Sequence, residues 1–405
     1  MKISNILSSY RSGFISKIKQ ISSSNATKKN FKAINLDFGS VRFYLARYFG
    51  FCYGVENAIE IAYRTIAENP SRRIFLLSEM IHNPLVNQEL SNKNVQFIFD
   101  SSGNQKISWD SITSDDIIII PAFGTSTEIE KKIIEKGIDI QKYNTTCPFV
   151  QKVWKRAFSL GENNFTVMIH GKHLHEETKA TFSRSEQNAP SFVVRDIEEV
   201  RIVSKIILSE IDKQEFYRIF EGKHSIGFDV NKDLERIGVV NQTTMLSSET
   251  QAIAEELKNT MIKKYGLENL HDHFADTRDT LCYATNNNQQ ATEALLNEKA
   301  DFAIVVGGYN SSNTTHLVEM LEKKFITYFI DSAEKILSTN QIKNFDIHLK
   351  NEKITDNFIP SDKKPTIILT SGASCPDSEV ENVISKLLSF FPQSRSFNEV
   401  LSDFR

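Results

Sequence analysis

The stretch FAIVVGGYNSSNTTHLVEML, residues 302–321, decides the fold because an apolar strand, a polar loop and an apolar-periodic helix follow one another directly. Short apolar strands that alternate with helices are typical of parallel sheets in α/β proteins. We therefore expect an α/β fold whose polar side chains lie beyond the carboxyl ends of strands and beside helix N-termini. The same order recurs in FTVMIHGKHLHEET (165–178), RIGVVNQTTMLSSET (236–250) and TIILTSGASCPDSEVENVI (366–384).

A longer unit occurs three times along the chain: a cysteine that opens a helix, a strand with a polar loop, a helix, a second strand and another helix. Cys52 opens the first copy, Cys147 the second and Cys282 the third. Three similar α/β domains in a pseudo-threefold arrangement would bring one cysteine each to a common centre. We expect an N-terminal extension (1–40), a first domain (41–146), a second domain with a helical insertion near 185–235 (147–280), and a third domain with a C-terminal tail (281–405).

Composition narrows the class of protein. The 405 residues are 40% hydrophobic and 24% charged, with a formal net charge of -3. Neither a basic tract suited to nucleic acid nor an apolar run of about 20 residues suited to a bilayer is present in the sequence, so we expect a soluble enzyme. The Ser-rich segment before Asp37 carries Lys and Arg but no acidic residue, which fits a flexible leader or, less well, a transit peptide. We expect a cytoplasmic protein, with the plastid stroma as the alternative.

The cysteines indicate a metal centre. Four cysteines without a secretory signal favour reduced thiols over a disulfide framework. Three of them occupy equivalent places in the repeat and suit an iron–sulfur cluster, with a zinc site of three cysteines and a water as the alternative. Cys375 has no equivalent in the other two copies and is interpreted as a neighbour of the site.

The loops after the strands are rich in Ser, Asn and His, a combination that can bind a diphosphate together with helix N-termini. Glu176 and Glu177 begin a helix, and either could be a proton donor or simply favour the helix dipole. Their spacing does not choose between them. The loop candidates are His82, His170, His173, His175, Ser311, Ser312, Asn313, Thr370, Ser371 and Ser374.

Eight motifs together resemble the LytB family of 4-hydroxy-3-methylbut-2-enyl diphosphate reductases. The resemblance implies reductive dehydroxylation of (E)-4-hydroxy-3-methylbut-2-enyl diphosphate to isopentenyl and dimethylallyl diphosphate, the last step of the methylerythritol phosphate route to isoprenoids. It implies one 4Fe-4S cluster per chain, held by Cys52, Cys147 and Cys282, with one open iron. The motifs, in order from about Phe43 to Ile384, are GFCYGVENAI, HNPLVNQEL, NTTCPFVQKVW, HGKHLHEETKAT, NQTTML, DTLCYAT, GYNSSNTTHLVE and TSGASCPD.

The same resemblance assigns roles to further residues. Glu177 takes the proton relay, and Thr243 or Thr244 holds the substrate hydroxyl, with Thr243 favoured. Electrons are expected from a partner such as ferredoxin or flavodoxin, since no dinucleotide fingerprint follows a strand. The residues implied to hold the diphosphate are His82, His175, Ser311, Ser312, Asn313 and Ser374.

Phe123, in PAFGTST, departs from many bacterial members, which carry a histidine that contacts the diphosphate at this place. The PAFG form, the HEET form, NQTTML and the middle insertion resemble the plant and cyanobacterial branch, whose members share this phenylalanine. The departure therefore puts one contact in doubt and leaves the implied activity in place.

Two alternative functions fit parts of the pattern. A three-domain, cluster-dependent dehydratase or synthase similar to quinolinate synthase would need Arg or Tyr at its loops to bind carboxylates. A non-catalytic iron–sulfur or zinc carrier would need neither Glu177 nor a diphosphate pocket.

Overall fold

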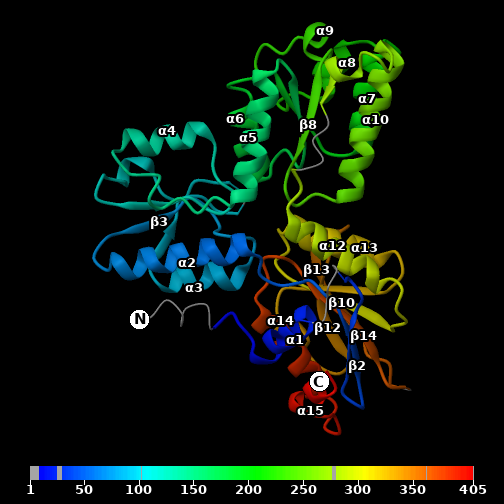
Figure 1. Ribbon diagram of the computed structural model, residues 1–405. Helices are drawn as coiled ribbons and strands as arrows, with labels where there is room; N and C mark the ends of the chain where they lie inside the picture. Colours follow the sequence, from blue (N-terminus) through cyan, green and yellow to red (C-terminus); the bar gives the residue numbers. More distant parts are fainter. Residues whose placement is uncertain (1–8, 25–29, 102, 276–279, 362, 405) are drawn as a thin grey trace. The chain divides into compact units, whose positions relative to one another are not determined.

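The computed structural model describes residues 9–24, 30–101, 103–275, 280–361 and 363–404 (Figure 1). Helices and strands alternate along the chain, which confirms the mixed α/β class. The chain divides into two compact units. The first consists of Met1–Pro70, Glu79–Val95 and Tyr283–Arg405, and the second of Ser71–Ser78 and Gln96–Cys282.

The first unit is built on a five-stranded sheet of order β1-β2-β14-β10-β11. β1 is antiparallel to β2, whereas β2, β14, β10 and β11 are parallel. Every residue of β10 is buried, because helices leave no face of a central parallel strand in water. The strands are β1 (Ile34–Asp37), β2 (Arg42–Leu45), β10 (Phe302–Val306), β11 (Thr327–Ile330) and β14 (Thr366–Ser371).

A small antiparallel hairpin, β12 (Gln341–Asp346) and β13 (Asn351–Asp356), also belongs to the first unit. The 3-10 turn η4 (Ala333–Lys335) lies between β11 and this hairpin in sequence. The helices of this unit are α1 (Gly13–Ser24), α2 (Tyr53–Glu68), α3 (Pro84–Asn92), α12 (Tyr283–Leu295), α13 (Ser312–Glu322), α14 (Asp377–Leu388) and α15 (Phe397–Ser402).

Helix α1 belongs to the core of the first unit. Ile15 and Ile18 are both 0% exposed, and Phe14 is buried with them. The helix packs on α14 and α15 (Figure 1). Lys19 adds polar contacts, since its Nζ lies 2.7 Å from Asp377 Oδ1 and 2.9 Å from the carbonyl oxygen of Phe49. The expectation of a flexible leader is therefore wrong for residues 9–24, because apolar side chains at helical spacing bury one face of α1.

The second unit contains two sheets, of order β4-β3-β5 and β7-β6-β8-β9. The strands are β3 (Ile74–Leu76), β4 (Val95–Phe97), whose first residue lies at the boundary, β5 (Ile117–Ile119), β6 (Thr166–His170), β7 (Ser191–Val194), β8 (Ile237–Asn241) and β9 (Phe274–Ala275). The helices are η2 (Trp109–Ser111), α4 (Thr127–Glu135), α5 (Pro148–Glu162), α6 (Glu176–Ser185), α7 (Ile197–Ile207), α8 (Gln214–Ile219), α9 (Val230–Asp233), α10 (Ser247–Tyr265) and α11 (Leu270–His273).

The four-stranded sheet is covered on both faces, with α5 and α6 on one side and α7 and α10 on the other (Figure 1). Alternation along β6 explains this, since Val167 and Ile169 join the core beneath α5 and Met168 joins the core beneath α7 and α10. The insertion expected to be helical contributes α7, α8 and α9, but it also contains β7. β7 is apolar and fully buried, and it pairs with β6 in parallel.

The repeated strand–helix–strand unit is present in each third of the chain. Its two strands pair in parallel in every copy, as β3 with β5, β6 with β8, and β10 with β14. Because parallel partners end at the same edge of a sheet, each pair presents two polar loops side by side. The pseudo-threefold placement of the three copies stays a prediction.

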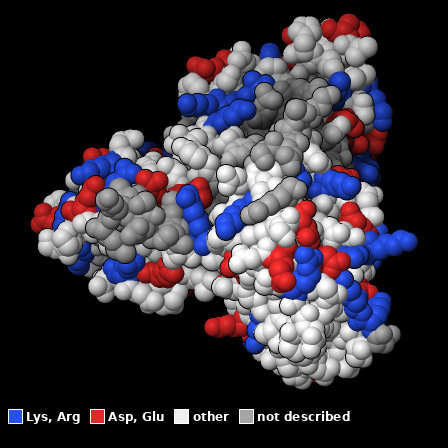
Figure 2. Space-filling model, turned by 60° about the horizontal axis from the view of Figure 1, so that its bottom comes forward, with Lys and Arg blue, Asp and Glu red and all other residues white. Residues whose placement is uncertain are grey.

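Charged side chains of both signs are interspersed on the face drawn in Figure 2. Among the helices that the structure describes, none combines the length and the apolar composition needed to cross a bilayer.

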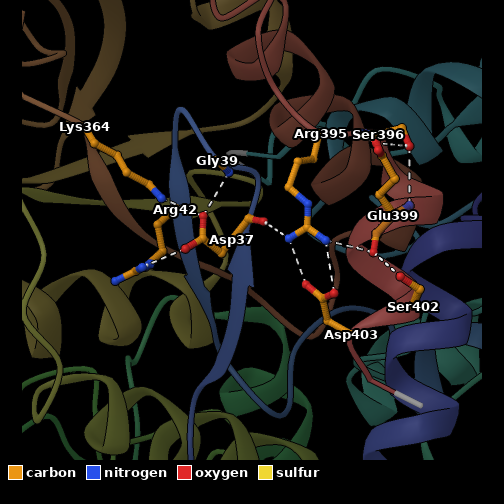
Figure 3. Close-up of polar contacts among 9 residues, drawn as sticks. All are labelled: Asp37, Gly39, Arg42, Lys364, Arg395, Ser396, Glu399, Ser402 and Asp403. Atoms are coloured by element: carbon orange, nitrogen blue, oxygen red, sulfur yellow. Dashed lines mark hydrogen bonds and ion pairs between the residues drawn. The ribbon is translucent and has the colours of Figure 1, made fainter.

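Arg395 links the C-terminal helix α15 to the end of β1 through hydrogen bonds (Figure 3). Its Nη1 donates to the carbonyl oxygen of Asp37 at 2.9 Å and to Asp403 Oδ2 at 2.8 Å. The carboxylate of Asp37 in turn accepts from Lys364 Nζ at 2.6 Å and from Arg42 Nη2 at 2.7 Å. Burial alone would raise the pKa of Asp37, but these two cations and the Gly39 amide outweigh it and hold that pKa well below its usual range.

Candidate functional site

Each of the three predicted cysteine ligands directly precedes a helix. Cys52 is the N-cap of α2 and Cys147 the N-cap of α5, and Cys282 stands just before α12. The backbone N–H of Cys52 donates to the carbonyl oxygen of Ala373 at 3.2 Å, which ties the Cys52 loop to the loop that carries Ser374. The helix starts expected from the sequence are therefore in place.

Cys147 and Cys282 both belong to the second unit; Cys147 is half-buried and Cys282 is buried. Burial, together with the nearby Cys282 and Glu177, outweighs hydrogen bonds from the backbone of Phe149 and Val150 and raises the pKa of Cys147 to about 11. Cys282 is 8% exposed. A metal that binds these thiols must displace their protons, and it then stabilises the thiolates in place of the protons.

Cys52 belongs to the first unit. Within the described residues, no three His, Cys, Asp or Glu side chains gather as a ready set of metal ligands. A cluster held jointly by Cys52, Cys147 and Cys282 therefore stays a prediction. Cys375 is fully buried, and burial raises the pKa of its thiol well above the usual value, as befits a packed neighbour.

Glu177, in the first turn of α6, is 2% exposed, and its carboxylate accepts hydrogen bonds from Thr243 in the loop after β8. Its Oε1 accepts the backbone N–H of Thr243 at 2.5 Å, and its Oε2 accepts the Thr243 hydroxyl at 2.9 Å. The hydroxyl of Thr244 instead accepts from the side chain of Gln242 at 2.6 Å. The geometry thus pairs Glu177 with Thr243, while Glu176 is only half-buried.

His175 is the N-cap of α6, and its Nδ1 accepts the backbone N–H of Glu177 at 3.2 Å. With Nδ1 engaged as an acceptor, the neutral ring carries its proton on Nε2. Phe123 meets this imidazole edge to face, with ring centroids 5.7 Å apart and planes at 82°. Phe123 therefore shapes the surroundings of His175 by packing, although it has no polar atom to offer a phosphate.

In the first unit, the loop after β10 ends at Ser311, which caps α13 by accepting the N–H of Thr314 at 3.3 Å. Asn313, in the first turn, is 2% exposed, and neither its amide nitrogen nor its amide oxygen has a hydrogen-bond partner among the described residues. Leaving buried polar atoms unpaired costs about 1–3 kcal/mol each. Such an amide beside a helix N-terminus is what an anion-binding loop offers before its ligand arrives.

The backbone carbonyl of His82 contacts both the loop that carries Ser374 and the loop that carries Gly308. The Ser374 hydroxyl donates to the His82 carbonyl oxygen at 3.2 Å, and a Cβ on Gly308 would overlap that same oxygen. The ring of His82 lies 3.1 Å from the Glu79 carboxylate. The first unit thus brings together five of the six predicted diphosphate ligands, His82, Ser311, Ser312, Asn313 and Ser374, whereas His175 belongs to the second unit.

The family model for the LytB protein matches residues 43–388. The chain belongs to the LytB family. It is 43% identical over 352 residues, 86% of each chain, to the 4-hydroxy-3-methylbut-2-enyl diphosphate reductase of Prochlorococcus marinus (strain MIT 9301). It is 41% identical over 381 residues, 94% of this chain and 90% of the relative, to the enzyme of the same name from Synechococcus sp. (strain ATCC 27144 / PCC 6301 / SAUG 1402/1).

The LytB membership confirms the family that the eight motifs indicate, and these relatives are cyanobacterial, as the PAFG and HEET forms suggest. A solved structure, the E-1-hydroxy-2-methyl-but-2-enyl-4-diphosphate reductase of Plasmodium falciparum, matches with a TM-score of 0.63. The two chains are 22% identical, and the match covers 88% of this chain and 89% of the other. At this identity the likeness shows a shared fold.

The remaining loop candidates of this LytB chain are buried or half-buried. His170 is fully buried, with Nδ1 3.0 Å from the Thr250 hydroxyl. His173 is half-buried, and burial lowers its pKa. Thr370 and Ser371 are 0% exposed at the end of β14.

The sequence places Gln242 at a strand end but assigns it no role, although its side-chain oxygen accepts the N–H of Lys172 at 3.1 Å and the hydroxyl of Thr178 at 3.0 Å. It thereby joins the loop after β8 to the loop after β6. Its place directly before Thr243 in NQTTML was the available signal.

Proposed function

We propose that this chain is a 4-hydroxy-3-methylbut-2-enyl diphosphate reductase, which converts (E)-4-hydroxy-3-methylbut-2-enyl diphosphate to isopentenyl and dimethylallyl diphosphate in the last step of the methylerythritol phosphate pathway. Relatives named for this activity match the chain over most of their length. The observation that carries the proposal is the buried pair of Glu177 and Thr243, which lies in the same unit as the thiols of Cys147 and Cys282.

One 4Fe-4S cluster per chain is proposed to be held by Cys52, Cys147 and Cys282, with one iron free of protein ligands. Thiolate is the donor that such clusters take, and the three cysteines begin three equivalent helices. When bound, the cluster supplies electrons and a Lewis-acidic iron for cleavage of the allylic C–O bond. The proposal includes three α/β domains, 41–146, 147–280 and 281–405, in a pseudo-threefold arrangement around this centre.

Replacing a hydroxyl by hydrogen consumes two electrons and two protons, and it releases one water. Glu177 is the proposed proton relay, because its carboxylate is buried and its Oε2 already accepts the Thr243 hydroxyl at 2.9 Å. The same hydroxyl of Thr243 can turn to the substrate oxygen, so a proton has a path of hydrogen bonds from Glu177 to the departing group. Thr244, bonded to Gln242, supports this loop.

The diphosphate group does not react, so its binding serves to orient the allylic carbon. Ser311, Ser312 and Asn313 offer hydroxyls, an amide and the N-terminus of α13, while His82, His175 and Ser374 complete the set. Phe123 contributes no hydrogen bond. This branch is therefore proposed to bind the diphosphate without the contact that a histidine makes at this place in many bacterial members.

The proposed electron donor is a one-electron carrier such as ferredoxin or flavodoxin. The proposed compartment is the bacterial cytoplasm, with the plastid stroma as the alternative. The first proposal concerns a separate electron-transfer protein, and the second concerns the compartment in which the chain works.

An anaerobic assay tests the proposed function. Purified protein, reconstituted with iron and sulfide, is mixed with the hydroxylated diphosphate and reduced methyl viologen, and the two products are quantified by mass spectrometry. Both isopentenyl and dimethylallyl diphosphate are expected. Absence of product from a protein that holds four irons would overturn the activity and favour a carrier, and stoichiometric zinc without iron would overturn the cluster as well.

A further inference from the structure

The loop GGYNSSN, residues 307–313, contains a single large side chain, that of Tyr309. Gly307 and Gly308 have no side chains to restrain the backbone, and glycine is the most permissive residue. Gly308 is required for the close approach of the loop to the His82 carbonyl oxygen, where a Cβ would overlap it. Tyr309 therefore provides the large side chain through which other elements of the first unit can fix this loop.

Tyr309 is held by three side chains that come from β11, β12 and β13. Its ring stacks on Phe345, with centroids 4.5 Å apart and planes at 14°. It meets Phe329 edge to face at 5.1 Å. Its hydroxyl lies 3.1 Å from Glu352 Oε1, to which it donates. The aromatic stack fixes the plane of the Tyr309 ring, and the hydrogen bond fixes the position of its hydroxyl.

Glu352 is itself fixed by two cations. Lys343 Nζ lies 2.6 Å from its Oε2, and Lys335 Nζ bonds its Oε1. Burial would raise the pKa of Glu352, but the hydrogen bonds from Lys335, Lys343 and Tyr309 outweigh it and lower the pKa to about 2. The carboxylate is ionised at neutral pH, so the Tyr309 hydroxyl donates to a charged acceptor, which strengthens the bond.

The turn η4 connects Glu352, and through it Tyr309, to the helix that follows the Ser374 loop. Lys335 ends the turn, and the backbone N–H of Ala333 at its start donates to Glu379 Oε1 at 2.6 Å. Glu379 lies in the first turn of α14, the helix that follows Ser374. One short turn thus braces both the loop of Asn313, through Glu352 and Tyr309, and the helix that begins after Ser374.

We propose that Tyr309 and Glu352 are positioning residues, which hold loop 307–313 in the conformation that binds the diphosphate. The inference rests on the proposed function and extends it to the hairpin β12–β13, which has no other assigned role. Neither residue belongs to the set proposed above to contact the substrate. Their loss should therefore weaken binding of the diphosphate and leave the chemical step unchanged, because a loop that must be ordered on binding lowers affinity.

Tyr309→Phe is the sharpest test, since it removes the hydroxyl and keeps the ring. Binding of inorganic diphosphate is measured by calorimetry, and KM and kcat by the anaerobic assay. We expect about a fivefold weaker Kd and a similar rise in KM, as for loss of one hydrogen bond, with kcat unchanged. Glu352→Ala removes the acceptor and the ion pairs with Lys335 and Lys343, so it should give a similar or larger change. The double variant should be no weaker than Glu352→Ala, since Tyr309→Phe then removes no further hydrogen bond.

Tyr328→Phe is the matched control, because Tyr328 is a buried tyrosine of β11 whose ring packs on Phe302 and Phe358 instead. It should leave Kd and KM as in the wild type. If Tyr309→Phe equals this control in Kd and KM, or lowers kcat at constant KM, the positioning role is wrong while the proposed function stands. If the wild type neither binds diphosphate nor forms product, the proposed function fails and this inference fails with it.

Discussion

The carboxylate of Glu177 receives both a backbone and a side-chain hydrogen bond from Thr243. Glu177→Gln replaces one acceptor oxygen by an NH2 group, which cannot accept from either donor and cannot carry the relayed proton. We expect turnover to fall by about 10²- to 10⁴-fold with iron content unchanged, measured by the anaerobic assay and by metal analysis. Glu176→Gln, one residue earlier, is the control and should keep turnover within about twofold of the wild type. Equal loss in both variants would remove the special role of Glu177.

Asp37 gives a pH-dependent contribution to stability. Lys364 and Arg42 hold its folded pKa below the usual value, against the effect of burial. A carboxyl whose pKa is depressed in the folded state stabilises fully above its unfolded pKa of about 3.9, and this stabilisation is lost as the pH falls through the folded pKa. Asp37→Asn should therefore be less stable than the wild type at pH 7, and in urea unfolding the difference should begin to shrink as the pH falls below about 4 and disappear only below the folded pKa of Asp37. A constant difference across this range would contradict the ion pairs.

At the scale of elements, helix α1 tests whether the N-terminal segment is part of the fold. Ile18 is 0% exposed and lies in the core with Phe14 and Ile15. Ile18→Ala removes buried methyl groups and leaves a cavity, so the free energy of unfolding should fall by about 2–4 kcal/mol. Lys17→Ala, at the neighbouring exposed position, should change it by less than about 0.5 kcal/mol. Urea unfolding followed by circular dichroism measures both changes. If Ile18→Ala were as stable as Lys17→Ala, the packing of α1 would not contribute to stability and the leader interpretation would stand.

The sequence predicts elements well where one periodicity dominates. The buried strands β6, β8, β10 and β14 are continuous apolar runs, and each is followed by the expected polar loop. Helix α1 was missed because its Ser and Lys residues suggest a leader, although Phe14, Ile18 and Ile21 recur at helical spacing. The hairpin β12–β13 was missed because its exposed face is polar, and its anchor on Tyr309 exists only in three dimensions.

Long-range pairing limits what could be predicted of the site. The motifs identified Glu177 and Thr243 separately, 66 residues apart. Only the fold brings the end of β8 to the first turn of α6. The same holds for Ser374 and the carbonyl of His82, which lie 292 residues apart in the chain. Residue type and position relative to a strand end indicate chemistry, whereas the partner of each atom depends on the way the sheets assemble.

At the scale of the whole molecule, the two units have separate hydrophobic cores. Both tryptophans, Trp109 and Trp154, belong to the second unit, so tryptophan fluorescence reports on that unit while circular dichroism reports on both. Units with separate cores can unfold at different denaturant concentrations when no bound group is shared between them. In protein without a cluster, we expect the two probes to give transitions that do not coincide.

The proposed cluster would change this behaviour, because its ligands include Cys52 of the first unit and Cys147 and Cys282 of the second. A group bound only by the folded state stabilises both units together, and neither can then unfold without releasing it. Reconstituted protein should therefore show coincident transitions by fluorescence and circular dichroism, shifted to higher urea. Cys52→Ser should restore separate transitions even after reconstitution. If the reconstituted wild type, with four irons bound, still unfolds in two separate steps, the cluster is held within one unit and Cys52 is not its ligand.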